Sequence, residues 1–184
     1  PVETRASTCK PDGMTLSLTI ILAQLNQSVG AISANADAML AVRAQYPDAD
    51  LIVFPEMQLI GYPSEDLVLK PAYVERAAAE MARLAAATGD GGPAMLVGSV
   101  MRVEGGIYNG VALLDGGQQA AVRLKHELPN YGTFDEKRLF KSGPLTTPIP
   151  FRGVQIGVPI CEDVWFPDVC AALKAAGAQL LLSP

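Results

Sequence analysis

The chain has 184 residues, of which 49 % are hydrophobic and 18 % are charged, so it predicts one globular domain and excludes a disordered chain. A formal net charge of −5, without a basic stripe, argues against nucleic acid or an anionic membrane surface as partner. The cysteines, Cys9, Cys161 and Cys170, lack framework spacing and predict free thiols in a reducing, cytoplasmic location. One histidine excludes a His-rich zinc site, and no membrane span or signal peptide is evident.

The expected elements alternate between strands and helices. Residues 1–13 are polar and without pattern, so we expect a disordered leader or a cloning remnant there, followed by a domain over residues 14–184. Apolar alternation or apolar runs predict strands over residues 16–25, 51–54, 94–100, 107–114, 118–124, 151–160 and 178–182. Helical spacing and end signals predict helices over residues 32–46, 65–70 (with Ser64 as a cap), 72–87 and 168–176. This order predicts an α/β fold with a mixed sheet and helices packed outside it. An apolar strand ending two residues before Pro184 suggests a fragment of a longer protein.

Cys161 lies at a change of direction near the end of the chain. An alternating strand, residues 154–160, leads into it, and Pro167 then opens a helix that Gly177 can end. A thiol at a strand-to-helix turn has backbone N–H groups close by, as a nucleophile needs when an oxyanion forms beside it. The alternative is a buried cysteine that packs as a small hydrophobic residue.

Glu56 and Lys125 also follow predicted strands, and ligands bind at the carboxyl ends of strands in open α/β sheets. Glu56, between apolar neighbours, is a candidate general base and acid. Lys125 is a candidate to hold the thiolate and to stabilise an oxyanion. His126 points to the opposite face of its strand from Lys125, so only one of them can line the site. Taken singly, each of these residues is also compatible with an ordinary surface position.

Together these motifs resemble the Glu–Lys–Cys triad of the nitrilase, or carbon–nitrogen hydrolase, superfamily. The matching residues are Phe54-Pro55-Glu56, Lys125 and Cys161-Glu162-Asp163. Two flanking segments, residues 61–67 and 128–140, resemble the N-terminal glutaminase domain of glutamine-dependent NAD⁺ synthetases. The resemblance covers residues 14–184 and implies a nitrilase-like α-β-β-α sandwich with mixed sheets, incomplete at its C-terminal end.

The resemblance implies hydrolysis of the glutamine side-chain amide through a cysteine thioester. Cys161 is then the nucleophile and Glu56 the general base and acid. Lys125 and the backbone N–H of Glu162 form the implied oxyanion hole, and Glu136 is the second glutamate that positions the lysine and the substrate. The implied substrate-binding residues, each otherwise an ordinary core aromatic, are Tyr62, Tyr131, Phe134 and Trp165.

The resemblance implies no metal and no cofactor for this domain. In the family, ammonia passes through a tunnel to a C-terminal synthetase domain, which amidates deamido-NAD⁺ with ATP and Mg²⁺. No phosphate-binding glycine-rich loop occurs in this sequence, so we expect that domain to be absent. The implied partners are glutamine, the synthetase domain of a longer protein and a second copy of the chain in a homo-oligomer.

Two alternatives to the glutaminase interpretation remain open at this point. A stand-alone amidase or carbamoylase of the same superfamily would act on another small amide, although the segment 131–140 argues against it. A truncated, inactive interaction module would keep the fold without the chemistry.

Overall fold

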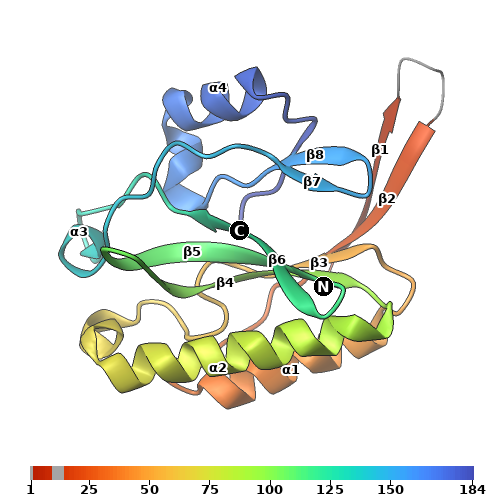
Figure 1. Ribbon diagram of the computed structural model, residues 1–184. Helices are drawn as coiled ribbons and strands as arrows, with labels where there is room; N and C mark the ends of the chain where they lie inside the picture. Colours follow the sequence, from red (N-terminus) through yellow and green to blue (C-terminus); the bar gives the residue numbers. More distant parts are fainter. Residues whose placement is uncertain (1, 10–14) are drawn as a thin grey trace.

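The computed structural model describes residues 2–9 and 15–184, which form two stacked β-sheets with helices on both outer faces (Figure 1). The larger sheet has the order β1-β2-β3-β4-β5-β6, with parallel pairs at β2–β3 and β3–β4 and antiparallel pairs elsewhere. Its strands are β1 Val2–Cys9, β2 Thr15–Leu22, β3 Leu51–Val53, β4 Ala94–Val103, β5 Gly106–Asp115 and β6 Gln118–Leu124. The smaller sheet contains β7 Ile149–Phe151, β8 Val154–Gly157 and β9 Leu180–Leu181.

Helices cover the outer face of each sheet. The α-helices are α1 Ile32–Gln45, α2 Pro71–Ala87, α3 Glu136–Leu139 and α4 Pro167–Ala175, and the 3-10 helices are η1 Glu65–Leu69, η2 Thr88–Asp90 and η3 Cys161–Trp165. Figure 1 shows α1 and α2 side by side below the larger sheet, while α4 lies beyond the smaller one. Pro167 occupies the first turn of α4, where its missing N–H costs nothing, and Gly177 follows the helix with a φ of 90°. The layers therefore follow the expected α-β-β-α order.

The central strands of the larger sheet, β3 and most of β4, are buried on both faces, which explains their apolar sequences. Along β3, Ile52 packs in the core beneath α1 and α2, whereas Leu51 and Val53 pack in the core between the two sheets. Successive side chains of a strand point to opposite faces, so an all-apolar strand fits a position covered on both sides. Full burial of one such side chain stabilises the fold by roughly 1.5–3 kcal/mol.

Residues 2–9 form a strand, which corrects the expectation of a disordered leader. The backbone of β1 pairs with β2 in antiparallel register, from Val2 opposite Leu22 to Cys9 opposite Thr15. An edge strand is held through backbone hydrogen bonds and needs no apolar alternation. A polar sequence therefore carries no pattern from which such a strand can be predicted. Residue 1 and residues 10–13, which belong to the same expectation, lie outside the described residues, as does residue 14.

The predicted strand over residues 151–160 is a hairpin instead. β7 and β8 pair in antiparallel register around Arg152 and Gly153, whose φ values are 45° and 83°. Two consecutive residues with positive φ make the turn that joins two right-twisted strands.

In the described part of the chain, Ser64 makes no side-chain cap to η1, so the predicted cap is wrong.

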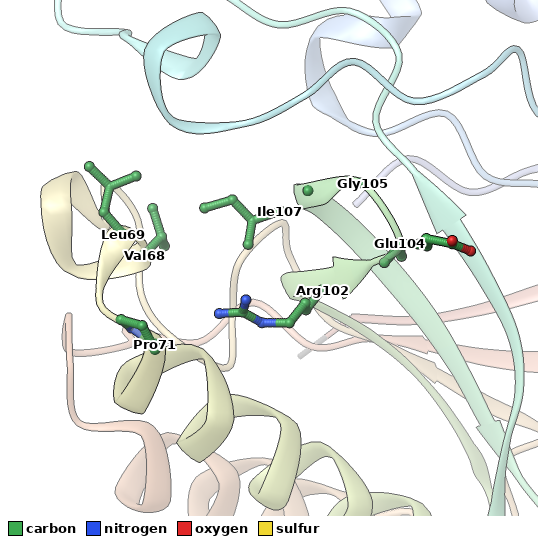
Figure 2. Close-up of a pocket in the computed structure, with 9 residues that line it drawn as sticks. Val68, Leu69, Pro71, Arg102, Glu104, Gly105 and Ile107 are labelled. Carbon is green, nitrogen blue, oxygen red and sulfur yellow. The ribbon is translucent and has the colours of Figure 1, made fainter.

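A cavity of about 600 Å³ lies between η1 and the β4–β5 hairpin (Figure 2). None of the predicted site residues lines it. Val68 and Leu69 line it on one side, with Ile107 and Arg102 across from them. Among the described helices, none is long and apolar enough to cross a membrane.

Candidate active site

Lys125 forms the centre of a buried charged cluster. It directly follows β6, where its N–H donates to the carbonyl of Asn109 (2.9 Å) and its carbonyl accepts the N–H of Gly143 (2.7 Å). Its side chain is 0 % exposed, and Nζ lies 2.6 Å from Oε1 of Glu56 and 3.1 Å from Oε1 of Glu136. Two carboxyl groups therefore face one ammonium.

The end of β3 places Glu56 in this cluster. The Phe54 N–H donates to the carbonyl of Leu96 on β4, which continues the pairing of the two strands up to the site. Beside it, Gly98 of β4 has no side chain to collide with the passing backbone; a Cβ there would lie 2.7 Å from the carbonyl oxygen of Pro55. The Glu56 side chain is only 12 % exposed.

The turn at Cys161 is held by Asp163, two residues later. Cys161 opens η3 with a φ of 44°, in the left-handed region that few residues other than glycine adopt. The buried carboxylate of Asp163 accepts the N–H groups of Ile160 (2.9 Å), His126 (3.2 Å) and Glu127 (2.7 Å). Because the last two directly follow Lys125, Asp163 ties the cysteine turn to the lysine segment.

The charges of the cluster act on one another and on the thiol. Burial alone would lower the pKa of Lys125, but the carboxylates of Glu56 and Glu136 raise it above its ordinary value. Burial raises the pKa of Glu136, and the Lys125 ammonium opposes that change. Burial and the Glu56 carboxylate raise the pKa of Cys161 to about 11, whereas Lys125 acts to lower it. The thiol is therefore protonated at neutral pH and needs a base.

Three of the four predicted pocket aromatics form a group beside the cluster. The Tyr62 hydroxyl donates to Oε1 of Glu136 (3.0 Å), and burial followed by the charge of Glu136 raises the pKa of Tyr62. Phe134 lies between the two tyrosines, with ring centroids 6.2 Å from Tyr62 and 5.5 Å from Tyr131. The Tyr131 hydroxyl donates to the carboxylate of Glu162 (2.9 Å). Trp165 is 78 % exposed, and its place in a pocket stays a prediction.

Sequence reasoning gave no role to two residues of the site: it did not single out Asn109, and it named Asp163 only as part of the Cys161-Glu162-Asp163 motif. Asn109 is fully buried on β5, and its Nδ2 reaches both Glu56 (2.6 Å) and Glu136 (3.2 Å). A lone amide within the apolar run of residues 107–114 was the available signal, since a buried polar group needs partners. For Asp163 no local signal existed, because two of its partners lie more than 30 residues away.

The arrangement combines a protonated thiol, a carboxylate and an ammonium without any metal ligand set. In residues 2–9 and 15–184, no group of three or more His, Cys, Asp or Glu side chains is arranged to hold a metal ion. The His126 ring lies with Nδ1 2.7 Å from the carbonyl oxygen of Gly143, so it is the Lys125 side chain that enters the site. A base, a cation and a nucleophile held in this way are suited to covalent acyl transfer.

Comparison with known proteins finds similar chains among glutamine-dependent NAD⁺ synthetases. The glutamine-dependent NAD⁺ synthetase of Rhodobacter capsulatus is 50 % identical over 173 residues, which cover 93 % of this chain and 31 % of that protein. The solved synthetase of Acinetobacter baumannii in complex with ADP superposes with a TM-score of 0.79 at 37 % identity, covering 90 % of this chain and 32 % of that one. The chain thus spans about a third of the length of these relatives.

A shorter relative has the same fold. An amidase of Nesterenkonia AN1 from the nitrilase superfamily superposes with a TM-score of 0.75 at 28 % identity, covering 90 % of this chain and 63 % of that one. Residues 19–183 match the carbon–nitrogen hydrolase family along their whole length. The chain therefore belongs to the carbon–nitrogen hydrolase family.

Proposed function

We propose that this domain hydrolyses the side-chain amide of glutamine through a thioester on Cys161. The observation that carries the proposal is the buried Lys125 ammonium, 2.6 Å from Glu56 and beside the cysteine turn. Similarity to glutamine-dependent NAD⁺ synthetases over 93 % of the chain supports glutamine as the substrate.

The proposed reaction starts with proton transfer from the Cys161 thiol to Glu56 as sulfur attacks the amide carbon. Because the thiol pKa is about 11, roughly one molecule in ten thousand would be thiolate at pH 7 without this transfer. Lys125 and the backbone N–H of Glu162 stabilise the oxyanion. Glu56 then returns the proton to the leaving nitrogen, ammonia departs, and a water molecule activated by Glu56 hydrolyses the thioester.

The proposed pocket is formed by the aromatic group beside the cluster. Tyr62 and Tyr131 each pack against Phe134, and the Tyr62 hydroxyl donates to Glu136. The carboxylate of Glu162, held by the Tyr131 hydroxyl, adds negative charge at its rim. We assign these residues, with Trp165, to glutamine binding.

The proposed product, ammonia, would be used by a synthetase domain. The glutamine-dependent NAD⁺ synthetases that match this chain are about three times as long as it is. We propose such a domain as the partner, with ATP and Mg²⁺ required there and not at the Cys161 site, and we propose that the glutaminase domains associate as a homo-oligomer.

Substrate comparison and covalent labelling test the proposal. We expect the purified chain to hydrolyse glutamine faster than N-carbamoyl amino acids, and a glutamine-mimicking diazo-ketone to add one adduct at Cys161, detected by mass spectrometry. Cys170, half-buried in α4, serves as the internal control and should stay unlabelled. A chain that gives no adduct at Cys161 would be the inactive interaction module.

The resemblance to the Nesterenkonia amidase supports a second candidate, a stand-alone amidase. Faster turnover of a simple aliphatic amide or an N-carbamoyl amino acid than of glutamine in the same comparison would favour it.

Gly98 offers a test of how the position of Glu56 controls the reaction. In Gly98→Ala the new Cβ lies 2.6 Å from the backbone N of Met57, so the Glu56 segment must move. We expect glutamine hydrolysis to fall about 100-fold, since displacement of a catalytic group by about 1 Å has this effect. Overpacking should also lower the free energy of unfolding by roughly 1–3 kcal/mol in urea titrations.

The matched control is Gly89→Ala, where the new Cβ meets its nearest atom at 3.4 Å, an ordinary contact. Equal activity of the two variants would show that the close approach at Gly98 does not position Glu56.

A further inference from the structure

Asn109 bridges the two carboxylates of the site, in parallel with Lys125. Its Nδ2 lies 2.6 Å from Oε1 of Glu56 and 3.2 Å from Oε1 of Glu136. An amide nitrogen carries two N–H groups, so it can donate one to each carboxylate. The same two oxygen atoms accept from Nζ of Lys125. An uncharged donor from β5 and a charged donor from the end of β6 thus hold the same pair of acids.

The orientation of the Asn109 amide follows from its neighbours. If the amide group were rotated by about 180°, Oδ1 would face the carboxylate oxygens of Glu56 and Glu136. Asn109 would then place an acceptor against two acceptors, with no N–H of its own between them. In the observed orientation, Oδ1 is buried and has no hydrogen-bond partner among the described residues. A buried acceptor without a partner is unfavourable, so the contacts of Nδ2 with the two acids must outweigh that loss.

The two donors at Oε1 determine where Glu56 can take up a proton. Lys125 and Asn109 each donate to this oxygen over 2.6 Å. A proton on Oε1 would point at two other donors, whereas Oε2 is left for it. The titratable or charged groups that act on Glu56 come from four segments: Lys125, Glu136, Tyr62 and Cys161.

We propose that Asn109 is a positioning residue of the reaction, which with Lys125 occupies Oε1 of Glu56 and reserves Oε2 for proton transfer. The inference rests on the proposed function for the identity of the reaction. In the first step the S–H bond of Cys161 breaks, an O–H bond forms at Oε2, and the sulfur electron pair attacks the amide carbon. In the second step the proton passes from Oε2 to nitrogen as the C–N bond breaks and ammonia leaves.

Two substitutions of Asn109 test the proposal. Asn109→Leu removes both N–H groups at similar volume, and Asn109→Asp keeps the shape but replaces the donor with an acceptor. Loss of a donor to a carboxylate favours its protonated form. We expect Glu56 to titrate at higher pH in both variants, by roughly one pH unit in Asn109→Leu. The acid limb of kcat/KM for glutamine should move by the same amount.

The titration is measured by ¹³C NMR of the carboxyl carbons, with the Glu56 signal assigned by its loss in Glu56→Gln. Asn35→Leu is the matched control, because Asn35 is also buried and donates to the carbonyls of Ser28 and Leu59, within a different network. Asn35→Leu should lower the free energy of unfolding and leave the pH at which Glu56 titrates unchanged.

An unchanged Glu56 titration in both Asn109 variants would overturn the proposal, and so would an equal shift in Asn35→Leu. The NMR measurement needs no substrate. A wild-type chain that fails to hydrolyse glutamine would therefore refute the proposed function, while the role of Asn109 would still be decided by the carboxyl titration.

Discussion

Cys161→Ala is expected to abolish glutamine hydrolysis, with a fall of about 10⁴-fold or more, because a covalent reaction loses its nucleophile. The fold should stay intact, since the side chain reaches the surface and Asp163 still holds the turn through its three backbone contacts. We expect the free energy of unfolding to change by less than about 0.5 kcal/mol in urea titrations. Steady-state ammonia release and trapping of a thioester by mass spectrometry measure the chemistry.

Cys170→Ala is the matched control, because Cys170 is a half-buried residue of α4. It should keep glutamine hydrolysis. If the Cys170 variant lost activity to the same extent, or the Cys161 variant kept it, the assignment of the nucleophile would be wrong.

Lys125→Met is expected to have the largest effect on stability. The side chain is 0 % exposed, and its removal leaves the carboxylates of Glu56 and Glu136 buried together without a cation. Breaking a buried ion pair in this way costs about 3–5 kcal/mol of folding free energy. Activity should be lost as well, because the oxyanion has no cation to stabilise it. Urea unfolding and ammonia release check the two effects separately.

A second substitution separates the charge effect from packing. Lys125→Met combined with Glu136→Gln removes one of the facing acids and should recover part of the stability but none of the activity. Lys137→Met, at an exposed lysine beside Glu136, should change neither. A fully stable Lys125→Met variant would mean that the buried cluster contributes little to folding.

The main parts of the fold, and the strand ends at which Glu56, Lys125 and Cys161 lie, could be predicted because their signals are local. Lys125 directly follows β6, and Glu56 and Cys161 lie within four residues of the ends of β3 and β8, so the end of a strand places each residue. The helices over residues 32–45 and 71–87 carry their own spacing and end signals in the sequence.

Other features depend on partners that are distant along the chain. β1 is defined by its pairing with β2, which polar residues do not reveal. The β7–β8 turn uses Arg152 and Gly153 in place of the Asn-Gly pair that marks such turns. The contacts of Asn109 with Glu136 and of Asp163 with Glu127 join residues that are 27 and 36 positions apart, so no local pattern reveals them.

The position of Asp163 has a mechanical consequence. Its carboxylate is joined to Ile160 on the smaller-sheet side and to His126 beyond the end of the larger sheet, so one side chain crosses the seam between the two layers. Sliding of one layer over the other would separate sulfur from ammonium before any strand came apart. We therefore expect substitutions in the core between the two sheets to lower the rate of glutamine hydrolysis before they change the secondary structure detected by circular dichroism.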